Sequence, residues 1–183
     1  SLANDDQPVF VADIAHSRTE LSKFKRISDQ YHFRKQVVIE ELKNRNIPLD
    51  FDAVIGRGGL AKPVSSGVFT ITEQMIIDQQ RAIHQHACDL GCMIADEIAR
   101  EIPGCKSFIA DPGVVDEMEP EARLSGSPLM PRMCIWHALN QKAIGRRFAK
   151  DMGTTYEKLN LIICHLGGGI SIAAHSQGRA IDA

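Results

Sequence analysis

The sequence has no long apolar run and no excess of basic residues, and each absence excludes a class of protein. No apolar stretch reaches the roughly 18 residues that a membrane-spanning helix needs, and residues 1–6 do not read as a signal peptide. The formal net charge is −2 and the pI is near 6.4, without the basic surplus that binding to nucleic acid or an anionic membrane usually requires. These features predict a cytoplasmic protein without nucleic-acid or membrane partners.

Aromatic residues and cysteines are also few. Aromatic residues make up 5% of the 183 residues, but 44% of the sequence is hydrophobic, which is enough to bury the core of one or two globular domains. The five cysteines are an odd number without a repeated spacing, so reduced thiols fit better than a disulfide framework. The chain contains no internal repeat and no low-complexity linker.

Strand-like and helix-like patterns alternate along the chain. The expected strands are residues 8–14, 51–56 and 107–111, and the expected helices are residues 28–46, 72–102 and 137–152. This alternation predicts an α/β fold. The pattern opens on a strand without an earlier partner and stops just after the start of a third strand near the C-terminus, so we expect a fragment or an incomplete chain.

The most informative motif is a glycine triplet, Gly167, Gly168 and Gly169, between two apolar stretches that read as strands. Residues without a Cβ let the backbone approach a ligand closely and let successive N–H groups converge on an anion. A P-loop would continue through a lysine into a helix, whereas a second strand and another turn follow here. The motif fits a phosphate-binding hairpin and a plain hairpin equally well.

Three polar residues stand where strands end or a helix begins. Arg57 lies among glycines that would let an anion reach its guanidinium, although an exposed arginine in a turn is the simpler interpretation. Asp111 precedes a Pro-Gly pair, and its spacing alone favours a turn cap. His137 lies near the start of a helix, where an imidazole can face an anion beside the positive end of the helix dipole or pack in the core.

Metal-ligand residue types also cluster in one segment, at His84, His86, Cys88 and Cys92. Residues 84, 88 and 92 would share one helix face while residue 86 points elsewhere, and the spacing is not a recurrent zinc spacing. Buried thiols and histidines on a helix face are the favoured interpretation, and we assign no metal site within the chain. We also assign no site to Arg146, which suits the end of its helix.

Five segments, in this order along nearly the whole chain, resemble the acetate and butyrate kinase family. They are residues 53–63, 86–91, 108–112 and 135–143, and the glycine hairpin from His165. The resemblance implies two ribonuclease-H-like domains that close over ATP, each a mixed sheet flanked by helices, as in sugar kinases, heat-shock cognate proteins and actin. It implies an acyl-substrate domain at residues 1–155 and the start of a nucleotide-binding domain at residues 156–183.

The implied activity is ATP-dependent, reversible phosphorylation of a short-chain carboxylate such as butyrate to an acyl phosphate, with Mg²⁺. Arg57 would bind the carboxylate, His137 would stabilise the transition state, and Asp111 would position the reactants or Mg²⁺ rather than act as an obligatory base. The resemblance implies further substrate contacts at Gly59, His86 and Trp136, and phosphate contacts at His165, Gly167, Gly168, Gly169 and Ser171. The family also suggests a homodimer. Since acetate-specific relatives place a valine at the position of Gly59, acids of four or five carbons are expected to be preferred.

The chain departs from the family in three places. The first phosphate motif is missing before Ala3, the adenosine motif is missing after Ala183, and Cys88 and Asp89 replace the usual serine and asparagine. We therefore expect the 183-residue chain to lack a complete nucleotide pocket and to show no kinase activity alone. A branched-chain carboxylate kinase and a non-catalytic binding relative remain alternatives, although the intact Arg57, Asp111, His137 and glycine triplet argue against the second.

Overall fold

The computed structural model describes residues 1–5, 7–59, 62–81 and 86–183. Its strands are β1 Leu2–Asn4, β2 Gln7–Phe10, β3 Ala53–Arg57, β4 Val68–Thr70, β5 Lys106–Ala110, β6 Asn160–Leu166, β7 Ile170–Ser176 and β8 Arg179–Asp182. Its α-helices are α1 Arg18–Leu21, α2 Tyr31–Asn44, α3 Glu73–Arg81, α4 Leu90–Arg100 and α5 Ala138–Asp151. Short 3₁₀ turns are η1 Ile27–Gln30, η2 Ala87–Asp89, η3 Glu121–Arg123 and η4 Tyr156–Lys158.

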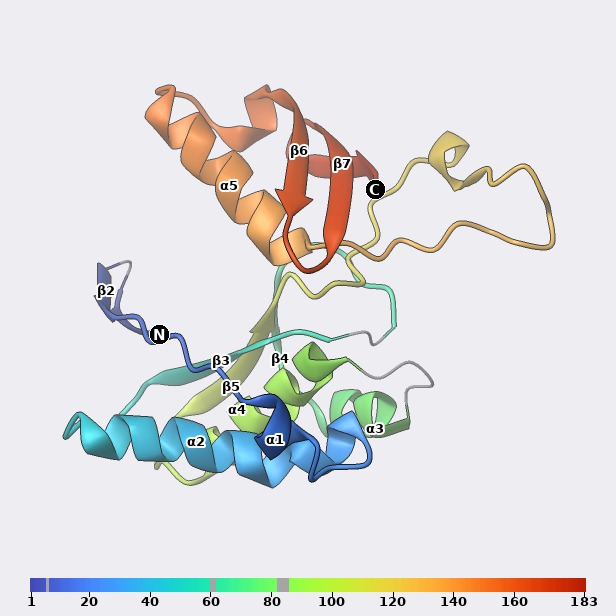
Figure 1. The fold of residues 1–183 in the computed structure, drawn as a ribbon. Coiled ribbons are helices and arrows are strands. Elements are labelled where there is room, and N and C mark those ends of the chain that lie inside the picture. The colour runs from blue at the N-terminus through green and yellow to red at the C-terminus, as the bar shows by residue number, and fades with distance from the viewer. Residues whose placement is uncertain (6, 60–61, 82–85) are drawn as a thin grey trace.

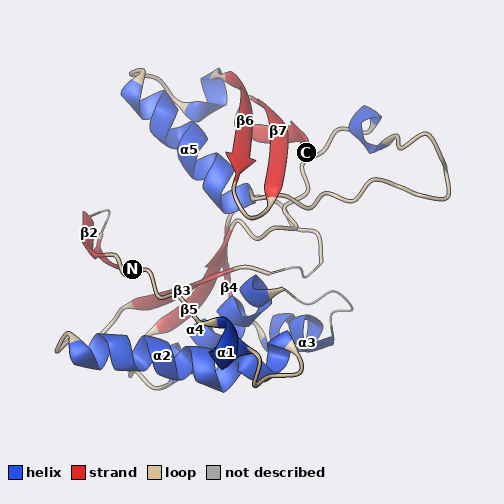
Figure 2. Cartoon of the chain, viewed as in Figure 1, coloured by secondary structure: helices blue, strands red, loops and turns tan. Residues whose placement is uncertain are grey.

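The first layered unit is a mixed three-stranded sheet with helices on one side (Figures 1 and 2). The strand order is β3-β5-β4, with β3 parallel to β5 and β4 antiparallel to it. Helix α4 packs directly on β3 and β5, and α2 packs on α4. The core of this unit contains Leu90 and Met93 of α4 beside Ile109 of β5. Each such buried side chain contributes about 1.5–3 kcal/mol of transfer free energy, which holds the sheet and α4 together.

The second unit is an antiparallel sheet, β6-β7-β8, with α5 packed against it. Along β6 and β7 the more buried residues alternate with exposed ones, as expected for a sheet covered on one face. The buried core of this unit includes Trp136, Ala138 and Ala173. The uncovered face of the hairpin presents apolar side chains, among them Leu166, which is 73% exposed.

Most of the expected elements are confirmed. The expected helices at residues 28–46 and 137–152 correspond to η1 with α2 and to α5, and the expected strands at residues 51–56 and 107–111 correspond to β3 and β5. The glycine triplet joins β6 to β7, and a second turn leads into β8. The α/β prediction with a mixed sheet and flanking helices is therefore confirmed.

The expected helix at residues 72–102 is wrong as one element, because α3 ends at Arg81 and α4 begins at Leu90. In the described part between them, the Asp89 carboxylate accepts a hydrogen bond from the backbone N–H of His86, and the His86 ring accepts one from Cys88 N–H. These local side-chain bonds to the backbone compete with continuous helical bonding and start the short turn η2.

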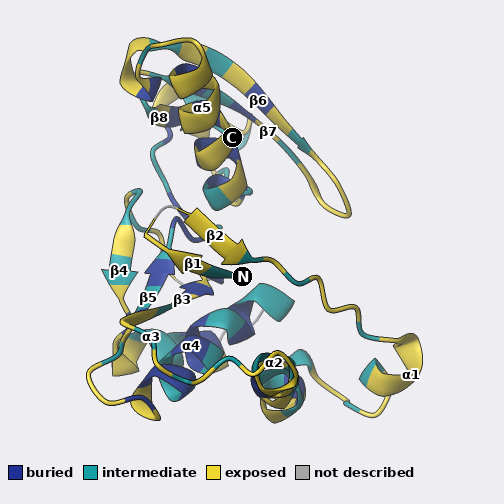
Figure 3. Ribbon diagram, turned by 90° about the vertical axis from the view of Figure 1, so that its left-hand side faces the viewer, coloured by how far each residue is buried: buried dark blue, intermediate teal, exposed yellow. Residues whose placement is uncertain are grey.

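The N-terminal expectations are also partly wrong. The strand expected at residues 8–14 ends at Phe10, and it has a partner, since β1 pairs with β2 in an antiparallel hairpin. Strand β4 was not expected. Figure 3 shows β2 as exposed, and α1 contains no buried residue, so this segment adds little to the core. Among the helices that the structure describes, none combines the length and apolarity required to cross a bilayer.

Candidate active site

Two of the expected site residues lie at the ends of neighbouring parallel strands. Arg57 ends β3 and pairs in register with Ala110 of β5, so Asp111 follows at the same edge of the sheet. The carboxyl ends of parallel strands are where α/β sheets usually bind ligands. Gly56 lets α4 approach this edge, because a Cβ there would collide with the carbonyl of Gly91. The small residues around Arg57 thus serve close packing of strand and helix.

Arg57 is exposed, and within residues 1–5, 7–59, 62–81 and 86–183 it has no ion pair. The pKa of His137 is lowered by burial and by His165, and the positive charge of Arg57 adds to this shift. An exposed guanidinium without a protein carboxylate partner can bind a ligand carboxylate through two parallel hydrogen bonds.

Asp111 is held in a fixed orientation. Its carboxylate accepts hydrogen bonds from the Ser66 hydroxyl at 2.6 Å and from the Gly67 N–H at 2.9 Å, and the side chain is only 5% exposed. Its second oxygen lies 3.4 Å from the guanidinium of Arg146 on α5. The backbone of Asp111 has a φ of 36°, which is uncommon for a residue with a Cβ. The strained backbone and two donors hold one carboxylate oxygen and leave the other facing α5.

Two histidines stack face to face beside the glycine turn. His137, directly before α5, and His165, on β6, have ring centroids 3.8 Å apart and planes within 7° of parallel. The pKa of His137 is lowered, first by burial and then by the positive charges of His165, Arg57 and His86. The neutral imidazole is therefore favoured near pH 7. Besides burial, three basic groups from separate elements act on the ring of His137, which suits a negatively charged ligand.

The glycine turn is open to solvent at its tip. Gly167 N–H donates to the Gly169 carbonyl at 3.1 Å, and none of the three glycines has a φ in the left-handed region. A Cβ on Gly168 would meet nothing within 4 Å, whereas one on Gly169 would lie 3.1–3.2 Å from the His137 ring. The backbone path therefore does not require glycine at these positions. The missing side chains leave bare backbone beside His137.

Comparison with known proteins finds similarity to one family. A family model described as "Acetokinase family" matches residues 132–183. A "Probable butyrate kinase" of Bacteroides thetaiotaomicron is 59% identical over 179 residues, which are 98% of this chain and 51% of that protein. "Butyrate kinase 1" of Clostridium acetobutylicum is 45% identical over 181 residues, 98% of this chain and 51% of that protein. The chain is thus similar to members of the acetokinase family along nearly its whole length. It spans about half the length of these curated relatives.

Solved structures support the acetokinase fold of the chain. Acetate kinase of Entamoeba histolytica superposes with a TM-score of 0.60 at 17% identity, covering 83% of this chain and 41% of that one. Acetate kinase of Porphyromonas gingivalis superposes with a TM-score of 0.57 at 23% identity, covering 72% of this chain and 35% of that one. At these identities the similarity concerns the fold alone.

Gly59 has a tighter environment than the acyl-pocket expectation assumed. A Cβ there would collide with the backbone of Asp89 and lie 2.8 Å from the side-chain oxygen of Gln79. A valine at this position would therefore also force η2 to shift. A role of Gly59 in substrate binding stays a prediction.

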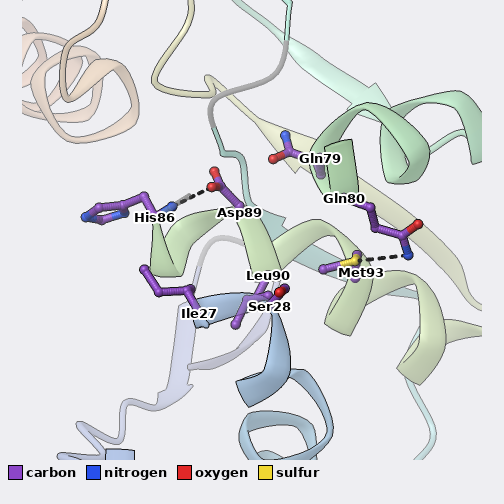
Figure 4. Close-up of a pocket in the computed structure, with 8 residues that line it drawn as sticks. All are labelled: Ile27, Ser28, Gln79, Gln80, His86, Asp89, Leu90 and Met93. Atoms are coloured by element: carbon purple, nitrogen blue, oxygen red, sulfur yellow. Dashed lines mark hydrogen bonds between the residues drawn. The ribbon is translucent and has the colours of Figure 1, made fainter. Parts of the chain in front are cut away.

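Figure 4 shows His86 at one side of a small cavity that Asp89, Leu90 and Met93 also line. The cavity volume is about 10 Å³, close to the minimum for one water molecule. Trp136 lies elsewhere, in the core beneath β7, with its indole N–H on the Val115 carbonyl at 2.7 Å. The substrate roles of His86 and Trp136 stay predictions, and the ring of Trp136 makes its contacts in the core.

The metal-ligand types in the 84–92 segment do not form a metal centre in the described part of the chain. His84 lies outside the described residues. The ring of His86 and the thiol of Cys88 are 3.0 Å apart. The pKa of Cys88 is raised, and burial is the largest cause. Cys92 lies on α4 and is buried in the core, and burial raises its pKa to about 11. Both thiols are therefore protonated near pH 7.

Sequence reasoning missed three residues around the site. Arg146 had been left without a role, yet it reaches Asp111 across 35 positions of sequence. The side-chain oxygen of Asn140 accepts a hydrogen bond from Nδ1 of His165 at 2.9 Å, and the Gln141 amide donates one to the Ser171 hydroxyl. Residues 137 and 141 are four apart on one helix, so helical spacing was the available signal for Gln141.

Proposed function

We propose that the protein transfers the γ-phosphoryl group of ATP to a short-chain carboxylate, with butyrate the preferred acid, and forms an acyl phosphate reversibly. The observation that carries the proposal is that His137 and His165 stack beside the open glycine turn, with bare backbone at Gly169 next to the His137 ring. The names of the relatives, probable butyrate kinase and butyrate kinase 1, favour butyrate. A branched-chain carboxylate kinase is the second candidate within the same chemistry.

In this reaction a carboxylate oxygen forms a bond to the γ-phosphorus, and the bond from that phosphorus to the bridging oxygen of ADP breaks. A carboxylate is already ionised at pH 7, so no base has to remove a proton from it. The protein must instead align the two oxygens and stabilise charge on the transferring group. In this proposal Arg57 binds the carboxylate and His137 donates a hydrogen bond to the phosphoryl group.

The residues present fit the nucleotide and its metal. The open tip at Gly168 leaves space for phosphate oxygens to approach backbone N–H groups. Mg²⁺ at phosphoryl-transfer sites is usually held by one or two carboxylates together with substrate phosphates, so a dedicated protein cage is not needed. Asp111 fits as that carboxylate, since within the described part of the chain its second oxygen has only the 3.4 Å contact to Arg146. When bound, Mg²⁺ would neutralise charge on the phosphates.

Three further features belong to the proposal. The first is a domain boundary, which we propose before α5 rather than after residue 155, because α5 packs on β6 and shares its core. The second is a homodimer, as the family suggests, which light scattering of the full-length protein would test. The third is a cytoplasmic location, supported by five cysteines that are all free thiols.

A hydroxamate trap tests the proposed activity directly. The full-length protein is incubated with ATP, Mg²⁺ and one acid at a time, from acetate to valerate and including isobutyrate and isovalerate. Highest acyl phosphate formation with butyrate supports the proposal. A higher kcat/KM with a branched acid favours the second candidate, and no product with any acid contradicts both.

Arg57→Ala then tests the carboxylate site. Removing a charge-assisted contact worth about 1.5–3 kcal/mol should raise KM for butyrate by roughly 10-fold to 150-fold and leave the Kd for ATP nearly unchanged. Arg100→Ala is the matched control, because Arg100 lies on α4, is largely exposed and pairs only with Asp96 among the described residues. An unchanged KM in Arg57→Ala would contradict the assignment.

A further inference from the structure

A buried line of hydrogen bonds runs from η4 through the core to the ring of His137. The Tyr156 hydroxyl bonds Nδ1 of His175, and Nε2 of His175 lies 3.0 Å from Oε1 of Gln141. Nε2 of Gln141 lies 2.9 Å from the hydroxyl of Ser171, which lies 2.7 Å from Nδ1 of His137. Gln141 is 0% exposed and His175 is 2% exposed, so water does not compete for these bonds.

The directions of these bonds follow from what each atom can do. The Gln141 amide nitrogen also lies 3.2 Å from the Ser171 carbonyl, which can only accept a hydrogen bond. The nitrogen therefore faces Ser171, and the amide oxygen faces His175. Nε2 of His175 must then donate, and its Nδ1 must accept from the Tyr156 hydroxyl. Burial lowers the pKa of His175 to about 4 and raises that of Tyr156 to about 12, in agreement with a neutral ring and a protonated phenol.

The same reasoning determines which group receives the hydroxyl proton of Ser171. Its hydroxyl oxygen accepts from the Gln141 amide and from the backbone N–H of His137 at 3.2 Å, which occupies both of its lone pairs. Its single proton is left for Nδ1 of His137. The ring proton of neutral His137 must then sit on Nε2. This nitrogen is the ring atom that would be 3.2 Å from a Cβ on Gly169, so it faces the glycine turn.

We propose that Gln141 is a positioning residue that, through Ser171, holds His137 as the neutral tautomer with its proton on Nε2. In this form His137 presents an N–H donor to an anion at the glycine turn and no lone pair that would repel it. The inference rests on the proposed function only for the identity of that anion. The titratable and charged groups that influence His137 are His165 on β6, Arg57 on β3 and His86 before η2, and each of their positive charges lowers its pKa.

The tautomer is measured by long-range ¹H–¹⁵N correlation spectra of ¹⁵N-histidine-labelled full-length protein, with the His137 signals assigned from His137→Gln. Wild type should show the Nε2–H pattern. In Gln141→Glu, a carboxylate replaces the amide donor, so the Ser171 hydroxyl turns toward it and Nδ1 of His137 acquires the proton. In Gln141→Met, which introduces no buried charge, the two tautomers should mix. Gln30→Met, at a buried glutamine on η1 outside the line, is the control and should match wild type.

Kinetics provide the second readout. Loss of a correctly oriented donor should lower kcat by roughly 10-fold to 100-fold in both Gln141 variants, with KM for the carboxylate changed less than about threefold. An Nδ1–H pattern in wild type, or Nε2–H patterns retained in folded Gln141→Met, overturns the inference, even if kcat falls. Because the spectra need no turnover, failure of the proposed kinase activity leaves this test intact and is recognised separately by the absence of acyl phosphate.

Discussion

Replacing Gly168 with valine tests the glycine turn with little disturbance of the fold. A Cβ at this position meets no atom within 4 Å, and the φ of Gly168 lies outside the left-handed region. A β-branched residue can therefore adopt this backbone without a clash. We expect the free energy of unfolding to change by no more than about 0.5 kcal/mol, as for an ordinary surface substitution.

The effect on ATP should be far larger. If phosphate oxygens contact the backbone N–H groups at the tip, the valine methyl groups occupy the space through which those oxygens approach. Losing one charge-assisted hydrogen bond costs about 1.5–3 kcal/mol, which corresponds to a roughly 10-fold to 150-fold higher Kd for ATP. Gly168→Ala, with a single methyl group, should show a smaller increase.

Isothermal titration calorimetry with ATP and Mg²⁺ measures the Kd, and thermal unfolding of the same samples measures stability. Leu166→Val is the matched control, because Leu166 is an exposed apolar residue on the same hairpin, just before the turn. Tight ATP binding by a stably folded Gly168→Val protein would show that the turn is not a phosphate-binding element.

The remaining predictions concern Asp111 and two buried polar groups. Asp111→Asn should lower kcat strongly while circular dichroism and Tm stay near wild type, since the amide oxygen can still accept the bonds made by Asp111; near-normal turnover would refute the assignment. Lys142 is 1% exposed and pairs with Glu117 at 2.7 Å, so Lys142→Met should cost about 3–5 kcal/mol in urea unfolding. Adding Glu117→Gln should recover part of that loss, and a strictly additive double variant would contradict the coupling. Because the folded pKa of His175 is about 4, below its unfolded value, stability should be complete above about pH 6.5 and decrease as the pH falls toward 4, and His175→Phe should flatten this dependence in calorimetry.

Local patterns were sufficient to predict the positions of the main site residues. Arg57 and Asp111 follow short apolar runs between turn residues, and these runs predicted that each residue lies at the end of a strand; their common sheet edge is known only from the structure. His137 precedes an amphipathic helix, and the glycine triplet separates two strand-like segments. Each of these signals is contained within about fifteen residues of sequence.

Contacts between distant segments could not be predicted in the same way. Gln141 meets Ser171 across 30 positions, and nothing in the local sequence of either residue indicates the other. The break before α4 depends on the short-range bonds of His86 and Asp89, which compete with a helical pattern that is otherwise continuous. The environment of Gly59 was misjudged because the comparison with relatives concerned side-chain size, whereas the structure shows backbone of Asp89 in the same space.

Helix α5 carries one end of each of two contacts, and this has a mechanical consequence. His137 precedes its first turn and bonds Ser171, while Arg146 extends from its third turn toward Asp111 on the other sheet. The two residues are nine positions apart, so the helix separates them by about 13 Å along its axis. Because α5 is a continuous 14-residue helix packed on β6, its two ends keep a fixed relative position. Any rotation of α5 relative to β5 therefore moves the His137 imidazole and the Arg146 guanidinium together. The 3.4 Å contact between Arg146 and Asp111 would change most, because it lies farthest from the start of the helix.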